Sequence, residues 1–194
     1  MEITSYLLGK KSSGGGSGSL DWSAIGYDST PKSIIDGYEF AQELLEDFNK
    51  SPNRSLTNDE KNKLIICPLL NTSSRITMQA FLIYCPSLLT IPLLDTNNAT
   101  SMQSMCNGCT NLRDVEILST AKVKNMTSAF GGCTHLTNTS LDNILQMCIN
   151  TSPEYTSPKT LQNVGIASAY YPASTIEALP HYQDFINAGW TIGY

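Results

Sequence analysis

The sequence predicts an α/β protein, a short solenoid in which each repeat contributes a short helix and a strand. The main observation is an internal period, because Cys85, Cys109 and Cys133 are each separated by 24 residues. Two further columns keep this register: Met78, Met102 and Met126, and Leu88, Leu112 and Leu136. A unit of this kind cannot bury its apolar face alone, so the repeats are expected to stack on one another.

Each repeat is expected to begin with a short helix. Its apolar residues follow the helical spacing i, i+3, i+4, i+7 in Met78, Phe81, Leu82 and Cys85, and again in the next two repeats. After a short turn, partial alternation of apolar residues over 88–94 predicts a strand.

A partial copy of the repeat precedes these, since residues 63–72 align with residues 87–96. The copy keeps the strand and lacks the helix. Pro68 and Pro92 fall in register. Proline has no N–H to donate to a strand ladder, so the hydrogen-bonded strand is expected to end before it.

The flanking segments complete the expected organisation. Residues 1–19 are an anchor peptide with a Gly/Ser linker, 20–56 a helical N-terminal cap, and 57–194 the solenoid with its C-terminal cap. In the N-terminal cap, Pro31 opens a helix. The apolar side chains of this helix have helical spacing: Ile34, Ile35, Tyr38, Ala41, Leu44, Leu45 and Phe48.

The C-terminal part departs from the repeat pattern. A longer helix is expected over 140–148 and a further strand over 161–166. A helical stretch over 176–188, interrupted at Pro180, then leads into 189–194 as a closing strand or cap.

Composition and charge exclude some classes of partner. Only 15% of the residues are charged, and the net charge of -5 includes no basic cluster, so nucleic acid is not an expected partner. Apolar runs stop well short of the roughly 20 residues that cross a bilayer, so no membrane insertion is expected. The first eleven residues do not read as a signal peptide.

The cysteines are expected to be reduced and buried. Cys106 and Cys109 form a CxxC motif, which suggests a redox or zinc site, but a second CxxC is missing and Cys106 replaces Leu82 and Phe130 of the sister repeats. Core packing is therefore the preferred interpretation, with no metal or cofactor. Asn-x-Ser/Thr sequons, such as those beginning at Asn53, Asn71 and Asn98, are read as chance occurrences in an Asn/Ser/Thr-rich surface.

The sequence is expected to be non-enzymatic. Its two histidines, His135 and His181, have no accompanying nucleophile or metal motif, and both are expected at the surface. One alternative is glycoside cleavage by Asp114 and Glu116, which lie two apart on a strand and would face the same side.

Outward strand positions predict a ligand-binding stripe across adjacent repeats. Its members are Thr90, Asp114, Glu116, Asn138 and Ser140. The sheet face of a solenoid is its natural binding surface.

The repeats resemble the BspA-like leucine-rich-repeat proteins of bacterial surfaces and of bacteriophages that infect gut bacteria. Residues 98–112 and 123–136 are similar to the family pattern N-x-x-x-M-x-x-M-F-x-G-C-x-x-L. The sequence departs from it with Cys106 for phenylalanine and Tyr84 for glycine. The likeness covers roughly residues 60–194 and implies a leucine-rich-repeat-like solenoid.

The N-terminus is similar to the anchors of phage structural proteins, with Ile3, Tyr6, Leu7 and Leu8 as the anchoring side chains. The resemblance implies a virion protein, held through this segment by other virion proteins, that attaches to a glycan or protein on the host surface. A homo-oligomer is expected. The alternatives are a bacterial cell-surface adhesin and a virion decoration protein without a ligand.

Overall fold

The computed structural model describes residues 31–194, with side chains from Phe40 onward. The expected anchor at 1–19 lies outside the described residues. The helices are α2 (Pro31–Lys50), α3 (Asn58–Lys63), α4 (Asn138–Ile149), α5 (Leu161–Val164), α6 (Ala173–Glu177) and α7 (Tyr182–Asn187). The strands are β1 (Thr90–Ile91) and β2 (Asp114–Val115).

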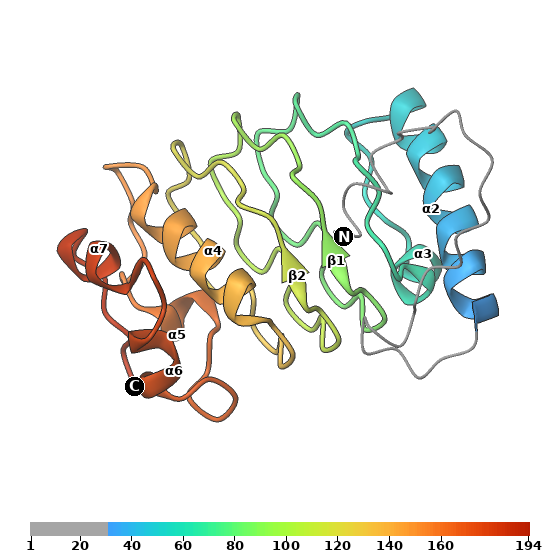
Figure 1. Cartoon of the computed structure of the whole chain (residues 1–194). Helices are drawn as coiled ribbons and strands as arrows, with labels where there is room; N and C mark the ends of the chain where they lie inside the picture. Colours follow the sequence, from blue (N-terminus) through green and yellow to red (C-terminus); the bar gives the residue numbers. More distant parts are fainter. Residues whose placement is uncertain (1–30) are drawn as a thin grey trace, which may run out of the picture.

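Between α2 and α4 the chain winds into stacked coils (Figure 1). Strands β1 and β2 pair in parallel, with Thr90 opposite Asp114, and isolated parallel bridges join Ile66 to Thr90 and Ser101 to Asn125. Every one of these pairs is offset by one repeat. The 24-residue register and the alignment of the partial copy with the first full repeat are confirmed.

The expected helix at the start of each repeat is wrong. Residues 78–85 form successive β-turns, in which Phe81 N–H donates to the Met78 carbonyl and Ala80 and Tyr84 have φ of 54° and 56°. Such left-handed residues are incompatible with an α-helix. Alternate N–H groups donate instead to the next coil. Met78 N–H donates to the Ser101 carbonyl at 2.8 Å, and Leu82 N–H donates to the Met105 carbonyl at 2.8 Å.

These turns explain why the spacing misled. The successive β-turns bring to the interior the same side chains that a helix would bury. Met78, Phe81, Leu82 and Cys85 are all buried. A buried face with this spacing therefore does not distinguish a helix from stacked turns.

A column of buried threonines links successive levels of the stack. Thr72 Oγ1 donates to the Asp95 carbonyl at 2.8 Å, and Thr96 Oγ1 donates to the Ser119 carbonyl at 2.9 Å. Thr120 Oγ1 continues the series. All three threonines are buried, so each hydroxyl satisfies a backbone carbonyl away from water, in the next coil for Thr72 and Thr96 and in α4 for Thr120.

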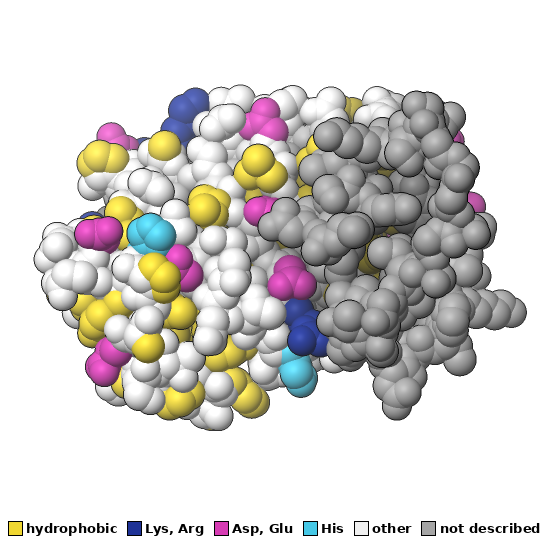
Figure 2. Space-filling model, in the orientation of Figure 1, with side chains coloured by type: hydrophobic (Ala, Val, Ile, Leu, Met, Phe, Trp, Pro, Cys, Tyr) yellow, Lys and Arg dark blue, Asp and Glu magenta, His cyan; other side chains and the backbone are white. Residues whose placement is uncertain are grey.

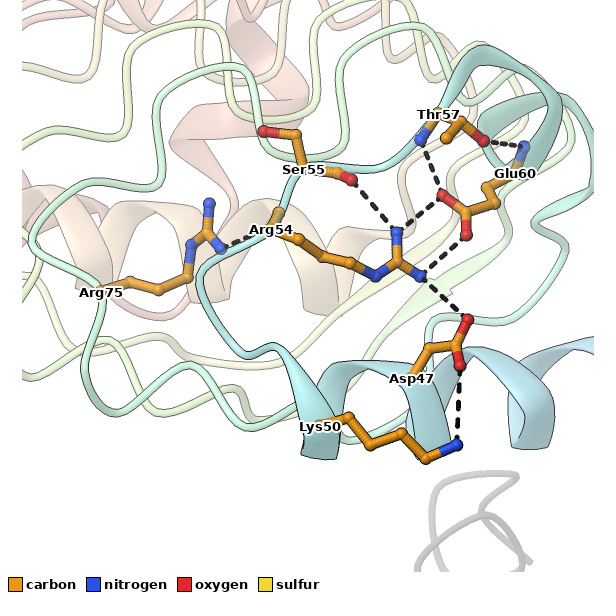
Figure 3. Close-up of polar contacts among 7 residues, drawn as sticks. All are labelled: Asp47, Lys50, Arg54, Ser55, Thr57, Glu60 and Arg75. Atoms are coloured by element: carbon orange, nitrogen blue, oxygen red, sulfur yellow. Dashed lines mark hydrogen bonds and ion pairs between the residues drawn. The ribbon is translucent and has the colours of Figure 1, made fainter.

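At the N-terminal end, α2 covers the stack. Its buried Leu44 and Phe48 belong to the same core as the repeats, and the Phe48 ring meets Phe81 edge-on at 5.8 Å. Arg54 lies between α2 and α3, where both its terminal nitrogens contact the Glu60 carboxylate at 2.8 and 2.9 Å (Figure 3). Glu60 also accepts the Thr57 N–H, completing a capping box at the start of α3.

At the C-terminal end, the helix expected over 140–148 is present as α4. The strand expected over 161–166 is wrong, because residues 161–164 form α5 between a Thr160 cap and a left-handed Gly165. Helices α6 and α7 lie on either side of Pro180, as expected. Residues 189–194 bring Thr191 into a single parallel bridge with Thr160.

Candidate ligand-binding surface

Two members of the predicted ligand-binding stripe are buried. Thr90 is 7% exposed and Ser140 is 2% exposed. The Ser140 hydroxyl donates to the Arg113 carbonyl at 2.8 Å and accepts the Val115 N–H at 2.9 Å. Ser140 therefore takes the place of a strand residue, joining α4 to β2. The expectation that Thr90 and Ser140 contact ligand is wrong.

The other members of the stripe reach the surface. Asp114 and Asn138 are exposed and Glu116 is half-buried. The Thr137 hydroxyl donates to Asp114 Oδ1 at 3.3 Å. The stripe is thus reduced to a short polar strip on β2 and the start of α4.

A groove lies beyond the strands, where equivalent segments of two successive coils run side by side. Residues 93–97 and 117–121 line it together with Asn150, which follows α4, and its volume is about 580 Å³. Leu93 is 61% exposed and Ile117 is 37% exposed. Groups able to hydrogen-bond with a ligand lie among the lining residues: Asp95, Asn97, Ser119 and Asn150.

The groove was not predicted because Leu93 and Ile117, as apolar residues of the expected strand segments, resemble core residues in the sequence. The buried leucine and isoleucine side chains of this segment, Leu88, Ile91 and Leu94, recur every three residues. That spacing leaves position 93 pointing outward. Leu69, at the equivalent position one coil earlier, is also exposed. The recurrence of an apolar residue at an outward position was the available signal.

The thiols lie in the core. All six cysteines are free and buried. Burial raises the pKa of Cys67 to about 12 and raises the pKa of Cys106 well above its ordinary value. The pKa of Cys109 is lowered, chiefly because Cys85 hydrogen-bonds to its sulfur. Within residues 31–194, no cluster of His, Cys, Asp or Glu is placed to hold a metal ion.

The two histidines make structural contacts. His181 Nδ1 lies 2.7 Å from Asp142 Oδ2, and the His181 N–H donates to Asp142 Oδ1 at 2.9 Å, which ties the start of α7 to α4. His135 is exposed, and its Nδ1 lies 2.7 Å from the Thr110 carbonyl oxygen.

Comparison with protein-family models, with curated proteins and with solved structures finds no match to this chain. None of the helices described is long and apolar enough to cross a membrane. Outside the residues drawn in grey, Figure 2 shows charged side chains scattered among hydrophobic and uncharged polar surface.

Proposed function

We propose that this chain is a non-enzymatic virion protein that displays a leucine-rich-repeat-like domain for attachment to the host cell surface. Residues 1–19 anchor it to the particle. The observation that carries the binding role is the groove between residues 93–97 and 117–121. The virion assignment is supported by the resemblance of the N-terminus to phage anchors.

The stacked coils suit such a groove because they hold its walls rigidly. Thr96 hydrogen-bonds to the carbonyl of Ser119, directly joining the two segments. Thr120 in turn bonds to the carbonyl of Met147 in α4. A binding site whose walls are fixed before contact loses less conformational entropy on binding.

The first experiment is mass spectrometry of phage particles purified from a producing culture. Peptides of this chain at a stoichiometric ratio to the capsid proteins support the virion assignment. Absence from particles, with the chain in the cell envelope, contradicts that assignment and favours the adhesin.

Removal of residues 1–19 tests the anchor separately. The shortened chain is expected to keep its folded repeat domain, measured by circular dichroism, and to be lost from particles. Incorporation at the normal level would contradict the anchoring role. A chain that shortens the Gly/Ser linker but keeps residues 1–11 is the matched control and is expected to enter particles.

A further inference from the structure

One edge of the stack presents an uncharged polar surface that the proposed groove does not include. We call it the turn-edge surface, and it consists of three columns of equivalent residues from three successive coils: Tyr84, Gly108 and Gly132; Pro86, Thr110 and Thr134; Ser87, Asn111 and His135. Each of the nine is at least partly exposed. None is Lys, Arg, Asp or Glu, so the surface offers no ion-pairing partner to a ligand.

Tyr84 is the one aromatic residue of this surface, and its position is unusual. It has a φ of 56° where the next two coils have Gly108 and Gly132 at 80° and 73°. A bulky residue is strained in this region of conformational space. Its side chain does not offset that strain by burial, since Tyr84 is 64% exposed.

The Tyr84 ring lies against the backbone of Gly108. A Cβ atom added to Gly108 would come within 2.5 Å of Tyr84 Cδ1 and 3.0 Å of Cε1. The Tyr84 ring can pack here because Gly108 has no side chain. Gly132 lies one coil further, and a Cβ added to it would lie 3.6 Å from Gly108 N. Gly108 and Gly132 together form a shelf of backbone without side chains.

Two polar side chains beside the shelf are held in place by the preceding coil. Asn111 Nδ2 donates to the Pro86 carbonyl at 2.8 Å. His135 Nδ1 lies 2.7 Å from the Thr110 carbonyl, which only accepts, so Nδ1 carries the proton. Asn111 Oδ1 and His135 Nε2 are left as acceptors, and no protein donor to either is recorded within residues 31–194.

We propose that the turn-edge surface binds a neutral oligosaccharide. One sugar ring stacks its apolar face on Tyr84, and hydroxyl groups of the ligand donate to Asn111 Oδ1 and His135 Nε2. Tyr84 and His135 are two coils apart, which is about 10 Å at the spacing of parallel strands, enough for at least two sugar units. This inference names a ligand class for the proposed attachment role and rests on that role.

The test is binding of the purified full chain to an array of neutral, sialylated and sulfated oligosaccharides, followed by calorimetry with the neutral oligosaccharide that binds best. The chain is expected to bind neutral oligosaccharides. Tyr84→Gly, which restores the residue of the sister coils, is expected to weaken binding by roughly tenfold or more, as loss of a stacked aromatic does. Tyr84→Phe keeps the ring and is expected to bind like the parent chain.

Matched controls separate the site from a general aromatic or folding effect. Tyr170→Ala removes another exposed tyrosine, at the C-terminal end, and is expected to leave binding unchanged. Asn111→Leu removes an acceptor while leaving Tyr84 in place, and is expected to weaken binding. Thermal melts of each variant check that the fold is kept.

The proposal is overturned if no neutral oligosaccharide binds, if only charged ones bind, or if Tyr84→Gly binds as tightly as the parent chain. These outcomes concern the purified chain. Particle incorporation is measured separately, so failure of the saccharide site and failure of the virion assignment are distinguishable.

Discussion

At the scale of single residues, the buried threonine column shows how the stack satisfies polar groups in its interior. The hydroxyls of Thr72 and Thr96 each donate to a backbone carbonyl of the next coil, and the Thr120 hydroxyl donates to the Met147 carbonyl in α4. Threonine thus bonds each level of the stack to the next at three successive levels. A buried carbonyl left without its donor carries a desolvation penalty.

Thr96→Val tests this column with little change in shape. It leaves the Ser119 carbonyl without the Thr96 donor, and we expect it to lower the free energy of unfolding by about 1–2 kcal/mol. Urea denaturation followed by circular dichroism measures the difference. Thr139→Val, at an exposed position in α4, is the control and should change stability by less than about 0.5 kcal/mol. Equal effects of the two variants would contradict a role for the column.

The groove is tested by the exposed apolar residues on its wall. Leu93→Asp places a charge in the groove at a position that is already exposed, so under the proposed attachment role the fold should be kept while binding of the purified chain to host cells is weakened. Flow cytometry with labelled chain measures this binding. Leu69→Asp alters the equivalent position one coil earlier, outside the groove lining, and should bind normally. Loss of binding in both variants would argue against the groove as the contact.

The buried thiols predict a loss of stability at alkaline pH. In the unfolded chain a thiol has a pKa of about 8.5, whereas the pKa of Cys67 in the folded protein is about 12. Unfolded chains therefore lose this proton first. The contribution of Cys67 is fully present below about pH 8.5 and is lost as pH rises toward about 12. Urea midpoints between pH 7 and pH 10.5 should fall more steeply for the parent chain than for Cys67→Ala.

At the scale of elements, the sequence predicted what depends on spacing alone and failed where backbone conformation decides. Helices α2 and α4 were predictable because Pro31 opens the first and a long apolar pattern marks the second. The register of the coils was predictable from the cysteine column. The turns at 78–85 were not, because Ala80 and Tyr84 give no warning of a left-handed backbone.

Helix α5 was missed for a related reason. The sequence places apolar residues at Leu161 and Val164, but the Thr160 hydroxyl caps the Asn163 N–H and Gly165 ends the turn at a φ of 106°. The carbonyls of Asn163 and Val164 then accept the N–H groups of Ser128 and Phe130. The helical turn thus accepts the hydrogen bonds that a further coil would otherwise accept. No local sequence pattern indicates this role. The groove was missed because it is formed between coils.

Gly165 provides the test at this scale. Its φ is positive, and an added Cβ would collide with the backbone of Gly131 in the neighbouring coil. Gly165→Ala is expected to lower the free energy of unfolding by about 3 kcal/mol or more. Gly189→Ala has a similar positive φ of 82° but open space around it, and should cost only about 1 kcal/mol. Thermal unfolding of the pair separates the collision from the conformational strain.

At the scale of the whole molecule, stability should be highest in the central coils, because a central coil has neighbours on both sides. The N–H groups of Met102, Ser104 and Cys106 donate to the carbonyls of Asn125, Thr127 and Ala129 of the next coil. Helix α3, by contrast, contains no buried residue. The molecule is therefore expected to open from its edges inward.

Hydrogen exchange measured by NMR tests this gradient. The amides of Met102, Ser104 and Cys106 should exchange at least about tenfold more slowly than those of α3. Slow exchange along 102–106 should break at Gln103, whose N–H bonds to the Ser101 hydroxyl, whereas the Met105 N–H bonds to the Met102 carbonyl within its own turn. Uniform protection through 102–106 would instead favour a helix there and contradict the turn structure.

The regular offset between coils has a consequence for how such a gene changes over time. The side-chain bonds of Thr72 and Thr96 recur at one offset, and those of Cys109 and Cys133 recur at another. An in-frame duplication of 24 codons would therefore insert one more coil without disturbing those already present. The groove would lengthen by one more copy of its wall. Recombination between repeats would thus alter the reach of the proposed binding face in whole-coil steps.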